Sequence, residues 1–156
     1  MSKMSTEMVI QWQRFEELSA DMLYEVLRFR QSIFVVEQRS PYPDLDGLDQ
    51  EAWHLLLRVE GALAGYLRLI PTPGPPPAVR IGRVAVAPHL RRRGIARGLM
   101  KEALRLCRER FPARDLVLAA QLYLVPFYEV LGFAVASTPY DDCGVPHVDM
   151  VAETVE

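Results

Sequence analysis

The stretch from Ile81 to Arg97, with the sequence IGRVAVAPHLRRRGIAR, constrains the fold of this chain more than any other feature. Its first part, Ile81–Val86, is rich in β-branched side chains and predicts a strand. Pro88 ends that strand, because proline cannot continue its hydrogen-bond ladder. A strong helix is expected to begin at Gly94. The pattern is therefore a strand, a basic loop and the N-terminus of a helix.

The helix N-terminus in this stretch has the properties of an anion-binding site. The first N–H groups of a helix have no partner inside it, and the helix dipole adds about half a positive charge there. Such an end favours phosphate groups. The small residues Gly94 and Ala96 allow a phosphate to approach the backbone. Positive charge is concentrated beside them at Arg91, Arg92, Arg93 and Arg97.

Two motifs give this stretch a family context. The spacing Arg91-x-x-Gly94-x-Ala96 resembles the Q/R-x-x-G-x-G/A signature of GNAT acetyltransferases. The segment FYEVLGF, Phe127–Phe133, resembles the F-Y-x-x-x-G-F motif of the same family. The resemblance covers nearly the whole chain. The segments most similar to the ElaA-like branch of the family are Phe34–Gln38, Pro41–Asp46 and Gly144–His147.

The resemblance implies the GNAT fold, an α/β (α+β) architecture whose mixed central sheet of about six to seven strands has helices on both faces. The 156 residues would then form a single domain, with a core over about residues 8–153. Strands are predicted near residues 8–12, 53–59, 62–70, 79–86, 116–120, 133–137 and 147–151. Helices are predicted after a cap at Ser19, from Gly94 to about Arg110, and over about Leu124–Leu131, with a hairpin turn at Glu60-Gly61.

The resemblance also implies acetyl-CoA as a co-substrate, and no metal. In GNAT proteins two central parallel strands, here Ile81–Val86 and Leu116–Ala120, splay apart and hold acyl-CoA in the gap. The pantetheine arm would follow the backbone of Val84–Val86, and the pyrophosphate would meet the N–H groups of residues 92–97. The predicted cofactor-binding residues are Val84, Ala85, Val86, Arg91, Arg92, Arg93, Gly94, Ile95, Ala96, Arg97, Gln121 and Phe127.

The expected reaction is direct transfer of an acetyl group to a primary amine of a small molecule or protein, in a ternary complex. Only a neutral amine attacks, so a base must remove a proton, and the thioester oxygen must be polarised. The resemblance assigns polarisation to the N–H of Val86 and protonation of the departing thiolate to Tyr128. For the base, three side chains stay open: His54, Glu37, and His147 in a loop that could close over the substrate. A chain of water molecules is a further alternative.

Two groups of charged residues have more than one interpretation. Three interior-looking arginines either pair with carboxylates or bind an acidic group of the substrate: Arg30, Arg68 and Arg83. The fragment Asp44-x-Asp46-Gly47 is similar to part of a calcium loop, but it lacks a third alternating oxygen ligand and the glutamate at position twelve. A turn is therefore favoured, although this acidic loop could also attract a cationic amine beside a substrate pocket.

Composition excludes several classes of protein. The net charge of −2 argues against a nucleic-acid or other polyanion binder. No apolar run approaches the ~20 residues of a membrane span, and the N-terminal residues predict no secretory signal. Cys107 and Cys143 are expected to be free thiols of a cytoplasmic protein. A homodimer, and a catalytically silent acyl-CoA sensor, stay open as alternatives.

Overall fold

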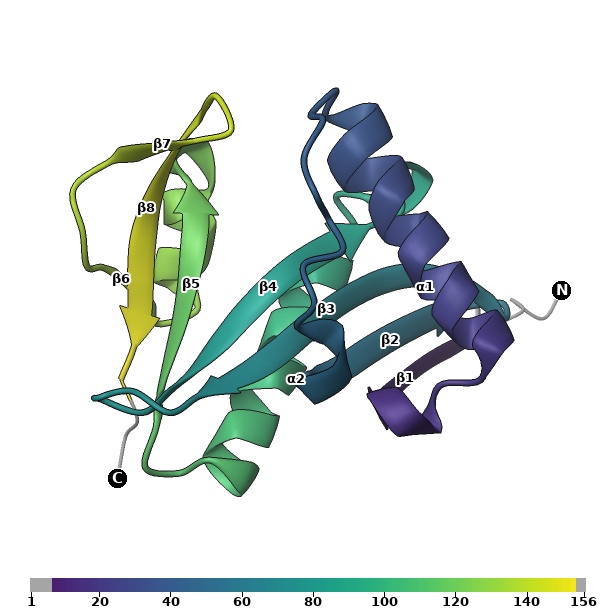
Figure 1. The fold of residues 1–156 in the computed structure, drawn as a ribbon, viewed down its shortest axis with the longest axis horizontal. Helices are drawn as coiled ribbons and strands as arrows, with labels where there is room; N and C mark the ends of the chain where they lie inside the picture. The colour runs from purple at the N-terminus through teal and green to yellow at the C-terminus, as the bar shows by residue number, and fades with distance from the viewer. Residues whose placement is uncertain (1–6, 154–156) are drawn as a thin grey trace, which may run out of the picture. The chain divides into compact units, whose positions relative to one another are not determined.

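A computed structural model describes residues 7–153; residues 1–6 and 154–156 of the predicted domain lie outside this range. Contacts within the chain define two compact units. The first unit contains the residues up to Arg68 together with Arg83–Leu99, and the second contains Leu69–Gly82 together with the residues from Met100. Three continuous elements run from one unit into the other: the strands β3 (Ala62–Thr72) and β4 (Ala78–Val86), and the helix α2 (Ile95–Arg110) (Figure 1).

Within the described residues, eight strands form a mixed sheet in the hydrogen-bonded order β1-β2-β3-β4-β5-β8-β6, with β7 paired to β8. The other strands are β1 (Met8–Arg14), β2 (Trp53–Val59), β5 (Asp115–Gln121), β6 (Ala134–Val135), β7 (Tyr140–Asp142) and β8 (Val145–Ala152). The other helices are α1 (Ala20–Gln31), the π-helical turn η2 (Ser32–Glu37) and α3 (Val125–Val130). Short 3₁₀ turns are η1 (Phe15–Glu17), η3 (Asp49–Glu51), η4 (Pro88–Leu90) and η5 (Leu122–Leu124). The predicted α/β class with a mixed sheet is confirmed.

In the first unit, the two faces of the sheet are covered by different helices. Leu56 of β2 and Tyr66 of β3 are fully buried against Val26 of α1. Successive side chains of a strand point to opposite faces, so the residue before Tyr66 in β3 faces α2 on the other side of the sheet. That residue is Gly65, where an added Cβ would lie 2.9 Å from Leu99 Cδ1. The sheet is therefore buried on both faces here, which explains its near-continuous apolar sequence.

Local signals in the first unit are confirmed. The Ser19 side chain accepts a hydrogen bond from the N–H of Met22 over 3.1 Å, and so caps α1. The turn between β2 and β3 has positive φ at both Glu60 (51°) and Gly61 (80°). Two positive φ values are typical of a primed hairpin turn, whose twist matches that of the flanking strands.

In the second unit, the first residues of β4 pair parallel with β5, from Ala78 opposite Asp115 to Arg80 opposite Val117. β5 then pairs antiparallel with β8 along its length. The sequence predicted a loop over residues 139–146, and this expectation is wrong in part because β7 forms there. Its hairpin with β8 turns at Cys143 and Gly144, which both have positive φ. This turn adds an eighth strand to the predicted six or seven.

Two further expectations concern cysteines and membranes. Both cysteines are free, as predicted: Cys107 is buried and Cys143 is exposed. Burial raises the pKa of the Cys107 thiol to about 12. No helix within residues 7–153 combines the length and the apolar character that a membrane span requires.

Candidate functional site

The N-terminus of α2, in the first unit, is open and lacks acidic side chains in its first turn. The residues before it turn sharply, with a φ of +65° at Arg92 and +78° at Gly94. A Cβ atom at Gly94 would have no neighbouring heavy atom within 4 Å. Backbone N–H groups at the start of a helix, a positive dipole end and free space together suit a phosphate group.

The side chains around this helix end complete a positively charged surface. Arg92, Arg93 and Arg97 are exposed, whereas Ile95 is buried and anchors the first turn in the core. Ala96 is half-buried and presents only a methyl group. The predicted loop residues therefore come together in one place, and their donors fit the diphosphate of an acyl-CoA.

Arg91 differs from the other loop arginines, because it binds protein groups. Its two terminal nitrogens donate to the Glu37 carboxylate over 2.6 and 2.7 Å, and its Nε donates to the carbonyl oxygen of Val86 over 3.1 Å. The hydrogen bond from Arg91 lowers the pKa of Glu37 below its usual value. Arg91 thereby joins the end of η2 to the end of β4, and the predicted base Glu37 is an ionised partner of that arginine.

The end of β4 carries the residues predicted to bind the pantetheine arm. Ala85 and Val86 are buried and Val84 is half-buried. The next residue, Ala87, donates its N–H to the carbonyl oxygen of Ala64 in β3 over 2.8 Å. Just before these residues, Arg83 has a φ of +54°, so the extended backbone of β4 is interrupted at its centre.

A network of three arginines and three aspartates lies in the first unit. Arg30 of α1, which has no exposed surface, donates to Asp49 over 2.7 Å and to Asp44 over 3.0 Å. Arg68 of β3 donates to Asp49 over 2.9 Å and also binds Asp46. The third arginine is Arg83 of β4, whose Nε lies 2.8 Å from Asp44 Oδ1. Three positive and three negative side chains therefore balance within a mostly buried cluster.

This network decides between the two interpretations of the arginines. Each interior arginine is paired with carboxylates from residues 44–49, so the structural interpretation is correct. The idea that the acidic loop attracts a cationic amine is weakened, because guanidinium groups neutralise its charge. Burial alone would raise the pKa of Asp49, but the hydrogen bonds and charges of Arg30 and Arg68 hold it below its usual value. For Asp46 the same balance lowers the pKa to about 2.

His54, the first of the predicted bases, lies in the core with 1% of its surface exposed. Its Nε2 lies 2.9 Å from the carbonyl oxygen of Asp49, and its Nδ1 lies 2.6 Å from the hydroxyl of Tyr66. A carbonyl oxygen only accepts, so Nε2 carries the proton and Nδ1 of the neutral ring accepts from Tyr66. Burial lowers the pKa of His54. Both ring nitrogens are used in hydrogen bonds to protein, which is a structural arrangement.

In the second unit, α3 places Tyr128 in an aromatic cluster. The ring of Tyr128 contacts Phe127 and Phe133 edge-on, with centroids 5.1 and 6.0 Å apart. Only 7% of Tyr128 is exposed, and burial raises the pKa of its phenol to about 12. The phenol therefore keeps its proton at neutral pH and is a hydrogen-bond or proton donor. Gln121 ends β5 opposite His147 of β8, and both are half-buried.

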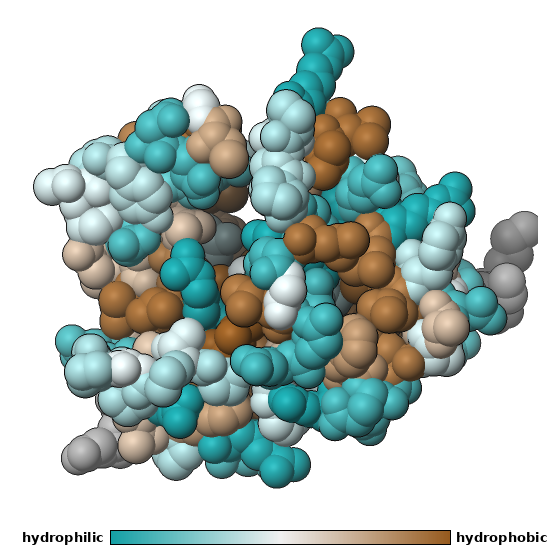
Figure 2. All heavy atoms as spheres, viewed as in Figure 1, coloured by the Kyte–Doolittle hydropathy of each residue, from teal (hydrophilic) through white to brown (hydrophobic). Residues whose placement is uncertain are grey.

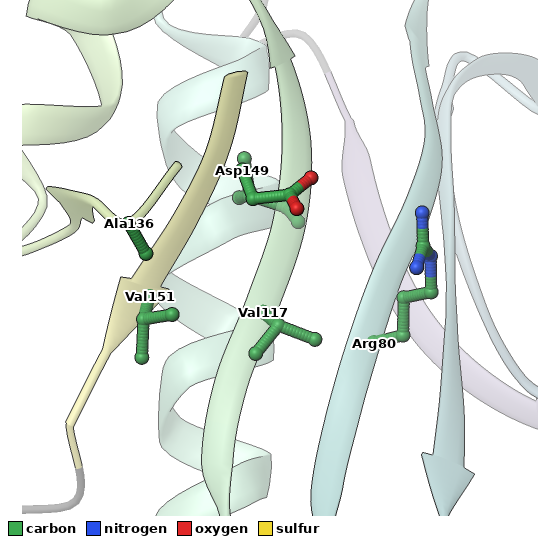
Figure 3. A pocket seen from close by; sticks show the side chains of 6 residues that line it. Arg80, Val117, Ala136, Asp149 and Val151 are labelled. Atoms are coloured by element: carbon green, nitrogen blue, oxygen red, sulfur yellow. The ribbon is translucent and has the colours of Figure 1, made fainter. Parts of the chain in front are cut away.

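A small cavity, which no sequence motif predicts, lies on the sheet of the second unit. Its volume is about 270 Å³, and its lining includes Arg80, Val117, Asp149 and Val151. Figure 3 shows Val117 between Val151 and Arg80, with the Asp149 carboxylate on the same face. Asp149 accepts a hydrogen bond from the Tyr140 hydroxyl over 2.6 Å. The cavity arises only when strands distant in the sequence pair, so no sequence motif marks it.

Apolar side chains also reach the surface near the ends of α1 and η2. Val36 is 65% exposed and Leu45 is 62% exposed, in the segment that carries Glu37 and the network aspartates. The space-filling view shows apolar groups at the surface among hydrophilic ones (Figure 2). The segment from Val36 to Asp46 therefore exposes apolar side chains to solvent, while its aspartates form ion pairs with buried arginines.

Comparison with known proteins places these features in a family. Residues 21–154 match the family described as the acetyltransferase (GNAT) domain. A UPF0039 protein of Synechocystis sp. is 37% identical over 141 residues, which cover 90% of this chain and 92% of that protein. Protein ElaA of Escherichia coli is 35% identical over 152 residues, or 95% of this chain and 99% of ElaA.

Solved structures give the same result. The crystal structure of Escherichia coli ElaA has a TM-score of 0.89 at 34% identity, and covers 94% of this chain and 100% of its own. The crystal structure of an acyl-CoA N-acyltransferase from Pseudomonas aeruginosa also has a TM-score of 0.89, at 31% identity and the same coverage.

Proposed function

Because the chain belongs to the GNAT family of acyl-CoA-dependent acyltransferases, in its ElaA-like branch, we propose that it is an N-acetyltransferase. The acetyl donor is acetyl-CoA, and the acceptor is a primary amine of a small molecule or protein. Transfer occurs directly within a ternary complex of enzyme, acetyl-CoA and amine.

The observation that carries this proposal is the open N-terminus of α2. Positive φ at Arg92 and Gly94, free space at Gly94, and exposed arginines on both sides support binding of the pyrophosphate to the N–H groups of residues 92–97. The backbone of Val84–Val86, which directly precedes this loop, is proposed to bind the pantetheine arm. Phe127 and Gln121 are proposed to contact the same co-substrate from α3 and β5.

The reaction exchanges one bond for another at the acetyl carbon. The amine nitrogen forms a C–N bond with the thioester carbon, and the C–S bond to CoA then breaks. The N–H of Val86 is proposed to donate to the thioester oxygen as negative charge builds there. Tyr128 is proposed to donate a hydrogen bond and then a proton to the departing thiolate; with a pKa of about 12 its phenol is fully protonated at neutral pH.

The amine must lose one proton in the same reaction. His54, Glu37 and His147 all form hydrogen bonds to protein groups, so we assign none of them this proton. We propose that the proton passes to solvent, and that the amine attacks from its neutral form. The rate at subsaturating amine is then expected to rise with pH as more amine becomes neutral.

The first test is calorimetric titration of the purified protein with acetyl-CoA and with CoA. The variant Gly94→Glu places a carboxylate in the proposed phosphate position, and we expect it to lose binding. Gly94→Ala is the matched control, because it has the same strained φ but no charge. Binding at least about tenfold weaker in Gly94→Glu than in Gly94→Ala supports the charge argument. Equal binding by both variants and the parent contradicts the assignment of the loop.

The second test is release of free CoA thiol in the presence of a panel of amines. Turnover with one class of amine supports the proposed activity and names the acceptor. Tight binding of acetyl-CoA without turnover of any amine favours a catalytically silent sensor instead.

A further inference from the structure

Arg83 is the residue of β4 that directly precedes Val84–Val86. Its φ of +54° lies in the left-handed region, which residues with a side chain rarely adopt. Such a backbone persists only where the surrounding structure holds it in place. An arginine does not favour this positive φ, and glycine would adopt it more easily. The reason for an arginine must therefore lie in its side chain.

The Arg83 side chain binds one loop. Its Nη2 donates to the carbonyl oxygen of Asp44 over 3.1 Å and to Asp46 Oδ2 over 3.4 Å, while its Nε lies 2.8 Å from Asp44 Oδ1 as an ion pair without hydrogen-bond geometry. Its guanidinium also lies 5.4 Å from the ring centre of Tyr42. A planar guanidinium bound at several points has a defined orientation, so these contacts restrain the attached backbone.

The loop that Arg83 binds is itself fixed. Asp44 is also held by Arg30, through its carboxylate and its carbonyl oxygen, each at 3.0 Å. Asp46 is also held by Arg68. Both of these arginines are almost entirely buried. Arg83 therefore connects β4 to a loop whose aspartates, Asp44 and Asp46, are already fixed by buried arginines.

The other end of the same short segment is also held. Arg91 donates to the carbonyl oxygen of Val86, and the N–H of Ala87 donates to Ala64. The three residues Val84–Val86 thus lie between two restraints, one at Arg83 and one at Arg91.

We infer that Arg83 is a positioning residue that sets the direction of the Val84–Val86 backbone for acyl transfer. The inference rests on the proposed function, in which the N–H of Val86 donates to the thioester oxygen. A donor of this kind accelerates the reaction only when its direction matches the developing charge, and small misplacements cost large factors in rate.

The variant Arg83→Gly separates the effect of the side chain from that of the backbone conformation, because glycine adopts the positive φ but has no guanidinium. Arg83→Lys keeps the charge and loses the planar fork. Arg58→Ala is the control: Arg58 also makes a bidentate ion pair in the first unit, with Glu25, but lies in β2. Thermal unfolding verifies that each variant is folded. Steady-state kinetics and amide hydrogen exchange then provide the two readouts.

For Arg83→Gly we expect kcat to fall at least about tenfold, while the Kd of acetyl-CoA, to which the same backbone contributes only in part, rises by a clearly smaller factor. Arg83→Lys should recover part of the lost kcat. Amide exchange at residues 84–86 should become faster in Arg83→Gly, and exchange in the first turn of α2 should not. Arg58→Ala should retain the kcat of the parent and its exchange at residues 84–86.

Two results overturn the inference. One is a kcat and an exchange pattern in Arg83→Gly equal to those of the parent. The other is a Kd for acetyl-CoA that rises as much as kcat falls, since Arg83 would then act in binding. A parent protein without turnover of any amine contradicts the proposed function, and exchange at residues 84–86 still tests the positioning: unchanged exchange in Arg83→Gly overturns it.

Discussion

The Nε of Arg91 lies 3.1 Å from the carbonyl oxygen of Val86, while the same guanidinium holds the Glu37 carboxylate at 2.6 and 2.7 Å. One side chain therefore joins the segment after α1 to the last residue of β4. The arginine that the family motif assigns to phosphate binding thus donates three hydrogen bonds to two protein groups. Its neighbours Arg92 and Arg93 are exposed, as Arg91 itself is.

Glu37→Gln tests whether this carboxylate is the base. We expect the variant to retain at least about a third of the kcat of the parent, because a carboxylate with a lowered pKa is a poor proton acceptor. The pair is partly exposed, so the free energy of unfolding should fall by no more than about 1 kcal/mol. Steady-state kinetics and urea unfolding measure the two quantities. A loss of kcat of more than about a hundredfold would instead identify Glu37 as the base.

Tyr128→Phe tests the proposed proton donor. Phenylalanine keeps the edge-on contacts with Phe127 and Phe133, so the fold and the Kd of acetyl-CoA should be nearly unchanged. The kcat should fall by about 10² or more, since general acid catalysis commonly contributes 10²–10⁴. In the parent, the pKa of about 12 predicts no loss of activity from this group below about pH 10. A Tyr128→Phe variant with the kcat of the parent rules out the assigned role.

His54 predicts a pH dependence of stability. Burial lowers its pKa in the folded state, so the unfolded chain takes up a proton near pH 6.5 while the folded chain resists it. The free energy of unfolding should therefore be fully present above about pH 6.5 and decrease as the pH falls below that value. Urea unfolding between pH 5 and 8 measures this slope. His54→Gln should flatten the slope; a slope unchanged in His54→Gln would contradict the buried neutral ring.

Arg30→Met tests the buried ion-pair network. The substitution leaves Asp44 and Asp49 without one of their positive partners, and breaking a buried pair in this way costs about 3–5 kcal/mol. Arg58→Met breaks the partly exposed pair with Glu25, which should cost about 1 kcal/mol or less. Chemical unfolding of both variants gives the comparison. Equal losses would show that the network contributes no more than a surface pair.

The same network predicts sensitivity to acid. The pKa of Asp46 is lowered to about 2 and that of Asp49 is lowered as well, so both carboxylates stabilise the folded state above their unfolded pKa near 4. That stabilisation is lost as the pH falls from about 4 towards 2.

Much of the fold follows from signals that act over a few residues. A serine cap, a hairpin turn at Glu60-Gly61 and the strand, loop and helix around Gly94 all depend on neighbours in sequence. The structure contains each of them where the sequence predicts it. The short β7 was missed because its hairpin needs positive φ at Cys143, a residue type that does not signal such a turn.

The site was predictable only in its local part. The residues proposed to bind the anion are consecutive, so the sequence contains the whole of that loop and helix start. His54 and Glu37 looked like bases because their residue types titrate usefully, but their partners lie elsewhere in the chain. Tyr66 is twelve residues from His54, and Arg91 is 54 residues from Glu37.

The sequence by itself determined the strand–loop–helix and the positive helix end that we propose binds phosphate, because backbone conformation and helix dipoles are set by adjacent residues. Only the tertiary structure decided which arginines form ion pairs with carboxylates of the protein. Arg30, Arg68 and Arg83 could have met a substrate or a carboxylate, and the chain folds so that residues 44–49 reach them. Burial makes an unpaired charge costly, so the pairing partner, and with it the role of each arginine, is fixed by contacts between distant segments.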